Sequence, residues 1–276
     1  MSEASSASAA TAPSAAGAWS AVGASAVAVA GFQLRRLLTR PRLLLAGLGM
    51  IFPAAVMLAV RRTAPVPLDR DLTVVMLYAL VPEAVCMLGL LVTMCPVVAD
   101  ELERGTWIHV AVRPGGRRAL LLGTFLAAVA WTSVVAVAAV VAALAVSGTS
   151  KPTGLVAMFA ALILLSAAGR AALFALPAVI LPKRALVASV GVALVVEFLC
   201  GLLPAVVNQA TVSLRLRSLL ADWMGWRRNL PTEIEMLVDP APAWVHVGAV
   251  SVLVVVLLTA AVLILERRQF PPSEEG

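Results

Sequence analysis

The stretch that decides the fold is ALLLGTFLAAVAWTSVVAVAAVVAALAV, residues 119–146, in which no charged side chain interrupts the apolar ones. A helix needs about 20 apolar residues to cross ~30 Å of hydrocarbon, and this run exceeds that length. Because it is uninterrupted, it differs from the short alternating apolar patches of a water-soluble core. The stretch therefore predicts a transmembrane helix.

Similar apolar runs occur along the rest of the chain. They cover residues 43–60, 72–98, 153–181, 185–207 and 243–265. Of the 276 residues, 61% are hydrophobic and 13% are charged, whereas soluble domains have roughly half and a quarter. We therefore predict an all-α membrane protein with about six transmembrane helices.

The two ends of the chain differ from this apolar middle. Residues 1–22 are Ala-, Ser- and Gly-rich and lack the basic start of a signal peptide, so we predict a disordered low-complexity segment. A basic amphipathic helix is predicted over about 24–38, ended by Pro41. Such a helix, just before a span, is typical of the membrane interface. The membrane domain then covers 23–270, and 271–276 form a short tail.

The distribution of basic residues predicts the orientation. An even number of spans places both termini on one side. Lys and Arg number 12 in the segments on that side and 8 on the other, so the positive-inside rule places both termini in the cytoplasm. The net charge of +6 is explained by these flanking residues, and no nucleic-acid partner is expected. The dominance of Arg over Lys and of Ala and Val indicates a bacterial plasma membrane protein.

Motifs for catalysis or metal binding are not found in the sequence. It contains no GxxxxGK[ST] phosphate loop and no HExxH pair. His109 and His246 lie far from any acidic cluster, and the three cysteines lie in apolar runs. We therefore expect no enzyme activity, no cofactor and no metal in this chain.

Three ionisable residues lie inside predicted spans, where a lone charge is costly: Glu83, Arg170 and Glu197. Arg170 precedes the turn at Pro182 and Glu197 follows it. At a rise of 1.5 Å per residue, they lie about 18 Å and 22 Å from that turn along their two helices. We favour an Arg170–Glu197 ion pair, with a place on a substrate path as the alternative. Glu83 is either protonated or faces a polar cavity beside Pro82.

The long connection 208–242 contains the apolar and basic stretch VSLRLRSLLADWMGW, residues 212–226. Its tryptophans suit the bilayer interface. The stretch fits short helices that dip into the outer leaflet, and it fits a surface loop equally well.

The connection 100–118 has a more specific pattern. Its acidic start, DELE, prolongs the preceding helix into water, and Gly105-Thr106 breaks that helix. Thr106 is expected to N-cap a second short helix, which Pro114-Gly115-Gly116 ends in a turn. A short helix held between two spans is able to receive a push from a partner protein. A solvated turn whose charges only set the topology remains the alternative.

The residues of this connection resemble the inner loop of ABC-2-type export permeases. The resemblance rests on E-x-E-R-G-T at 101–106, on Pro114 with a following arginine, and on L-L-G at 121–123. The interfacial helix, the six spans and the long outer connection agree with that family. Two positions depart from it, because Thr124 stands where the family often has lysine and glycines follow Pro114.

The resemblance implies a function and partners. The chain would be the membrane-spanning permease subunit of an ATP-driven exporter, paired with a second permease, as a homodimer or with a sister subunit, among membrane lipids. A separate ABC ATPase would bind the loop. The expected ATPase-coupling residues are Glu101, Glu103, Arg104, Gly105, Thr106, Trp107, Pro114 and Arg117.

Two other functions remain open. One is an ion-coupled secondary transporter that uses Glu83, Arg170 or Glu197 as coupling groups. The other is a non-transporting scaffold or regulator with a permease-like fold.

Overall fold

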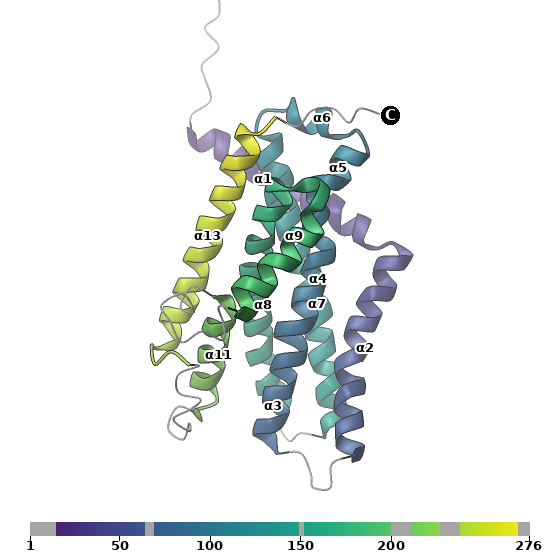
Figure 1. The fold of residues 1–276 in the computed structure, drawn as a ribbon, viewed down its shortest axis with the longest axis vertical. Helices are drawn as coiled ribbons and strands as arrows, with labels where there is room; N and C mark the ends of the chain where they lie inside the picture. The colour runs from purple at the N-terminus through teal and green to yellow at the C-terminus, as the bar shows by residue number, and fades with distance from the viewer. Residues whose placement is uncertain (1–14, 64–68, 149–151, 200–210, 227–237, 270–276) are drawn as a thin grey trace, which may run out of the picture.

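The computed structural model of the chain describes residues 15–63, 69–148, 152–199, 211–226 and 238–269. Within these residues all regular structure is helical. The long helices run side by side as a bundle, with short helices at one end (Figure 1). The prediction of an all-α protein is therefore confirmed for the described part of the chain.

Five helical rods in the described residues are long and apolar enough to cross a membrane. They are α2 (Arg40–Thr63), the rod Arg70–Val97, α7 (Gly116–Ser147), α8 (Pro152–Ile180) and α13 (Ala243–Arg267). Each coincides with one of the predicted spans to within three residues at either end. The remaining predicted span, 185–207, is described only to Leu199, as α9 (Ala185–Val192) and η4 (Ala193–Leu199), so six spans remain a prediction.

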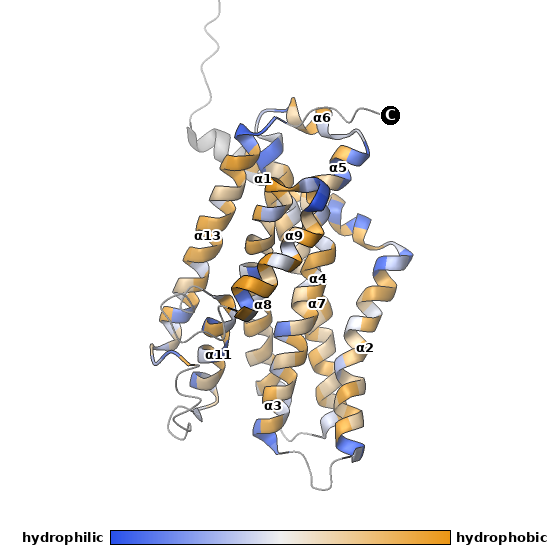
Figure 2. Cartoon of the chain, viewed as in Figure 1, coloured by the Kyte–Doolittle hydropathy of each residue, from blue (hydrophilic) through white to orange (hydrophobic). Residues whose placement is uncertain are grey.

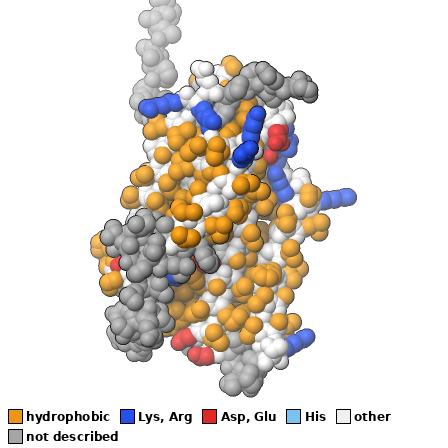
Figure 3. Space-filling model, viewed as in Figure 1, with side chains coloured by type: hydrophobic (Ala, Val, Ile, Leu, Met, Phe, Trp, Pro, Cys, Tyr) orange, Lys and Arg blue, Asp and Glu red, His pale blue; other side chains and the backbone are white. Residues whose placement is uncertain are grey.

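The flanks of the bundle expose many large apolar side chains, and their contact with water is unfavourable. Leu44 and Leu48 of α2, and Val252 and Val255 of α13, are exposed. Hydrophobic residues cover the middle of the helices, and charged ones gather mainly near their ends (Figures 2 and 3). Contiguous apolar faces of this size suit lipid as the surrounding medium.

The rod Arg70–Val97 is broken twice, each time at a proline. It consists of α3 (Arg70–Tyr78), the π-helical η1 (Ala79–Val85), α4 (Cys86–Thr93) and the 3₁₀ turn η2 (Cys95–Val97). Pro82 lies inside η1 and Pro96 inside η2. A proline has no N–H to donate and its ring displaces the carbonyl one turn earlier, so the wider π turn accommodates Pro82.

Helix α1 (Ala15–Leu37) contains the predicted interfacial helix and begins earlier than predicted. The segment expected to be disordered, 1–22, is helical from Ala15, because alanine has the highest helix propensity; its first 14 residues lie outside the described part. α1 lies at the same end of the bundle as α5, α6 and the end of α13 (Figure 1). It packs on α7 at Gly123, where a Cβ atom would come within 2.7 Å of the Ala26 carbonyl oxygen.

The stretch 212–226 forms a short helix, as one of the two predicted alternatives has it, and not a surface loop. Its residues Val212–Trp223 form α11, which packs on α8 and α13. Leu216 and Leu219 are fully buried. The apolar positions of this helix therefore belong to the core of the bundle, while Trp223 stays exposed. Residues 227–237 of the predicted outer connection lie outside the described part, as does the predicted tail, 271–276.

Candidate functional site

The connection after η2 forms a helical hairpin on the end of the bundle. It consists of α5 (Ala99–Glu103) and α6 (Trp107–Ala111), with Gly105 between them and Gly115 after them. Both glycines have positive φ, +67° and +69°, which residues with a side chain rarely adopt. The helix break at Gly105 and the turn at Gly115 agree with the sequence prediction.

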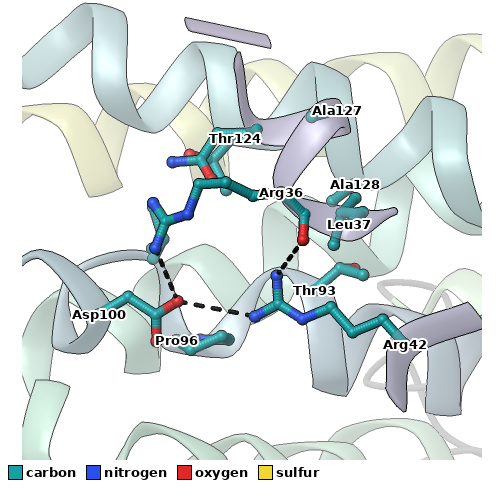
Figure 4. Close-up of a pocket in the computed structure, with 11 residues that line it drawn as sticks. Arg36, Leu37, Arg42, Thr93, Pro96, Asp100, Thr124, Ala127 and Ala128 are labelled. Atoms are coloured by element: carbon teal, nitrogen blue, oxygen red, sulfur yellow. Dashed lines mark hydrogen bonds and ion pairs between the residues drawn. The ribbon is translucent and has the colours of Figure 1, made fainter. Parts of the chain in front are cut away.

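The acidic start of this hairpin is tied to α1 and α2. The Arg36 guanidinium donates to Glu101 at 2.8 Å and to Asp100 at 3.3 Å. Arg42 Nη2 lies 3.7 Å from the Asp100 carboxylate, and Arg42 also donates to the Arg36 carbonyl (Figure 4). Glu101 is buried, so this expected coupling residue faces the protein's own α1.

Thr106 occupies the N-cap position of α6, but its side chain does not cap that helix. Its hydroxyl donates to the Glu101 carboxylate instead. The reason is local: the residue has helical dihedrals, φ −80° and ψ −12°, whereas a capping residue has an extended conformation. The predicted N-cap is therefore wrong, and Thr106 joins α6 to α5.

Trp107, one of the expected coupling residues, is buried, with 6% of its surface exposed, so its ring faces the protein's own bundle. Its ring packs within the bundle end, and the Arg117 guanidinium lies 5.6 Å from its centroid. Arg117 also donates to the carbonyls of Leu265, Glu266 and Arg268, at 3.0–3.3 Å. These are the carbonyls that the end of α13 leaves without helical partners.

A neighbouring ion pair strengthens the same junction. Arg118, at the start of α7, pairs with the carboxylate of Glu266 near the end of α13. Both side chains are about one-third exposed, 34% and 29%, so water screens the attraction. The hairpin is thus joined directly to α1 at its beginning, and it reaches α13 through Arg117 of α7, which lies against Trp107.

The outward face of the hairpin is formed by other residues than the sequence predicted. Ile108 and Val112 are exposed at 62% and 77%, one helical turn apart. Glu103, Arg104 and Pro114 of the expected set are exposed too. Sequence reasoning missed Ile108 and Val112 because both faces of the short α6 are apolar, which leaves the inward face undecided.

A second cluster of polar groups lies inside the bundle, around Arg170 of α8, which is fully buried. Its Nη2 lies 3.4 Å from the Glu197 carboxylate, which confirms the predicted pair. The closer carboxylate, however, belongs to Glu83, the residue for which no partner was predicted. Arg170 Nη1 also donates to the Pro82 carbonyl and to the Ser166 hydroxyl.

The two carboxylates of this cluster have different surroundings. Glu197 accepts backbone N–H groups of Val212 and Ser213, at 3.2 Å and 3.1 Å, at the start of α11. Backbone N–H groups at a helix N-terminus are suitable donors for a carboxylate. Glu83 accepts the Tyr78 hydroxyl at 2.7 Å, and a quarter of its side chain is exposed.

The cluster links two irregular segments. Glu83 lies in η1 and Glu197 in η4, and both segments are π-helical. Arg170 and the Ser213 hydroxyl each contact both carboxylates. The rod Arg70–Val97, α8, η4 and α11 are therefore joined by one polar network.

Neither place shows a grouping typical of a metal site. Within the described ranges, no three His, Cys, Asp or Glu side chains are arranged to hold a metal ion. Cys86 and Cys95 are buried free thiols, and Cys200 lies outside those ranges.

Comparison with known proteins adds no assignment. No family model matches the chain, and no curated protein matches it.

Proposed function

We propose that the chain is the membrane-spanning permease subunit of an ATP-driven exporter of the ABC-2 type. One observation carries the proposal: the segment with the permease-like motif is a helical hairpin that exposes Ile108 and Val112, is ion-paired to α1, and packs Trp107 against Arg117 of α7. An exposed apolar patch on a rigidly held element is suited to protein contact. The proposal places ATP binding in a separate subunit, in keeping with a sequence that has no GxxxxGK[ST] phosphate loop.

The fastening of the hairpin provides a route for mechanical coupling. A push on α6 moves Trp107, and with it Arg117 and the end of α13. The same push moves α5, whose Glu101 and Asp100 hold Arg36 of α1. ATP-driven closure of two ATPase subunits would thus tilt the helices joined to the hairpin and open the path to the opposite side.

In this proposal the bundle end that carries the hairpin lies in the cytoplasm of a bacterial cell. A second permease, either another copy or a sister subunit, completes the path. The exposed charges of Glu103 and Arg104 flank the apolar patch and provide a polar rim, as protein interfaces commonly have.

A second candidate function is an ion-coupled transporter. The specific observation in its favour is the buried network in which two carboxylates share one guanidinium, each carboxylate lying in a π-helical segment. Helix breaks that carry ionisable groups are typical of coupling sites in such transporters. This candidate requires activity from the chain without any ATPase.

Co-purification tests the proposal. The tagged chain, expressed in its own host and extracted in mild detergent, is expected to retain an ATP-binding-cassette ATPase and to show vanadate-sensitive ATP hydrolysis. The variant Ile108→Asp/Val112→Asp should lose the ATPase. The control Leu38→Asp, at an exposed apolar residue between α1 and α2, should keep it. Proton- or sodium-driven transport by the chain alone would favour the second candidate instead.

A further inference from the structure

A groove runs along the outside of the bundle between α2 and α4. Its volume is about 360 Å³, and α7 forms its floor. The lining is apolar and includes Leu45, Leu48, Phe52, Leu88, Val92 and Trp131. An apolar cavity of about 150 Å³ is known to hold a benzene molecule, so this groove has room for a longer hydrocarbon chain.

The groove has the length of one leaflet. Along α2 it extends from Arg42 to Phe52, which is about 15 Å at 1.5 Å per residue. The hydrocarbon of a whole bilayer is ~30 Å thick, so the groove matches the depth of a single acyl chain. It lies in the half of the bundle near α1.

The groove ends against a polar pocket. This pocket, of about 20 Å³, shares Leu37, Arg42 and Thr93 with the groove and is lined by Asp100 as well (Figure 4). The buried hydroxyl of Thr124, which also lines it, has no hydrogen-bond partner among the residues that the structure describes. A pocket of this volume has space for about one water molecule, so it offers a hydrated polar end to whatever occupies the groove.

Positive charge predominates at that end. Arg36 and Arg42 are partly neutralised by the carboxylates of Asp100 and Glu101. Two further exposed cations, Arg35 and Arg40, lie near the same end. Two more, Lys183 and Arg184, shortly precede Leu186, a groove residue at the start of α9. A ligand with a negative head and an apolar tail complements both parts.

We infer that the groove binds one acyl chain of an anionic phospholipid, with its phosphate against Arg40 and Arg42. The site is independent of any ATPase and of the cargo. Each basic residue near a headgroup contributes about 1 kcal/mol to the attraction, which is about fivefold in affinity.

Native mass spectrometry of the full chain in detergent tests this site, with phosphatidylglycerol and phosphatidylcholine as probes. Wild type is expected to retain one phosphatidylglycerol per chain in preference to phosphatidylcholine. Arg40→Gln/Arg42→Gln should weaken that preference by about 25-fold, since two basic residues are removed. The control Arg62→Gln/Arg70→Gln removes two exposed arginines at the other end of the bundle and should leave it unchanged.

A variant that fills the groove distinguishes the contribution of the acyl chain to lipid binding from that of the headgroup. A Cβ atom on Gly49 would lie 3.7 Å from Val135 and 3.8 Å from Val85, so Gly49→Leu fits the packing and extends into the groove. It should lose tightly held lipid of either class while its thermal unfolding stays that of wild type. Unchanged lipid retention in Gly49→Leu, or an unchanged preference in the double arginine variant, overturns the inference. A third outcome also overturns it: wild type is a dimer, and Gly49→Leu makes it monomeric without any loss of lipid. In that case a second copy of the chain, and not a lipid, fills the groove.

Discussion

Replacing Arg170 with methionine is expected to produce the largest loss of stability from any single change in the buried polar network. Methionine keeps much of the side-chain length but supplies no donor. The carboxylates of Glu83 and Glu197, and the Pro82 carbonyl, then lose the guanidinium that holds them.

The size of the stability loss follows from the carboxylates that stay buried without a partner. Removing one partner of a buried ion pair costs about 3–5 kcal/mol, because the other partner keeps an uncompensated charge. At about 2–4 °C per kcal/mol for a chain of this size, the melting temperature should fall by roughly 6–20 °C. Glu197→Gln should cost about 1.5–3 kcal/mol, as for a hydrogen bond to a charged group.

Glu83→Gln is the informative comparison. Glu83 is a quarter exposed, and its loss leaves Arg170 paired with Glu197. A glutamine oxygen still accepts the Tyr78 hydroxyl, so we expect a cost of at most about 1 kcal/mol. Circular dichroism of the three variants during heating in the same detergent gives the order directly. An Arg170→Met variant that melts within 1 °C of wild type, or a Glu83→Gln variant less stable than Arg170→Met, refutes the reasoning.

The remaining predictions concern the hairpin end of the bundle. In a cysteine-free background, a cysteine at Val112 should resist a membrane-impermeant thiol reagent in intact cells and one at Thr63 should react; the reverse result inverts the topology. Gly123→Val should lower stability by about 1–3 kcal/mol through overpacking against α1 and expose α1 to protease, and an unchanged digestion pattern would contradict that contact. Trp107→Ala should cost about 3–5 kcal/mol as a buried large-to-small change, and a melting curve like that of wild type would show that the side chain is not packed.

The helices were predictable from the sequence because their cause is local. Uninterrupted apolar runs identify the five described rods, and Pro82 and Pro96 identify the breaks in one of them. The depth of a residue along a helix is also local, which is why Arg170 and Glu197 could be paired from their distances to one turn.

What the sequence left undecided depends on how helices are rotated and placed against one another. Glu83 lies on a different rod, and nothing in its spacing shows that it faces Arg170. The part played by Ser213 depends on α11 entering the bundle, which amphipathic spacing does not distinguish from a helix in the interface. The burial of Trp107 in place of Ile108 has the same origin, because a five-residue helix with two apolar faces carries no signal for its rotation.

The central claim, that a separate ATPase docks on the outward face of the hairpin, is tested most directly by photo-crosslinking in cells. A photoreactive amino acid is placed at Ile108, with Thr63 at the other end of α2 as the matched exposed control. An ultraviolet-dependent adduct with an ATP-binding-cassette ATPase, identified by mass spectrometry, is expected at Ile108, and no such adduct is expected at Thr63. Correctly inserted, folded protein that gives no ATPase adduct at Ile108 would contradict it.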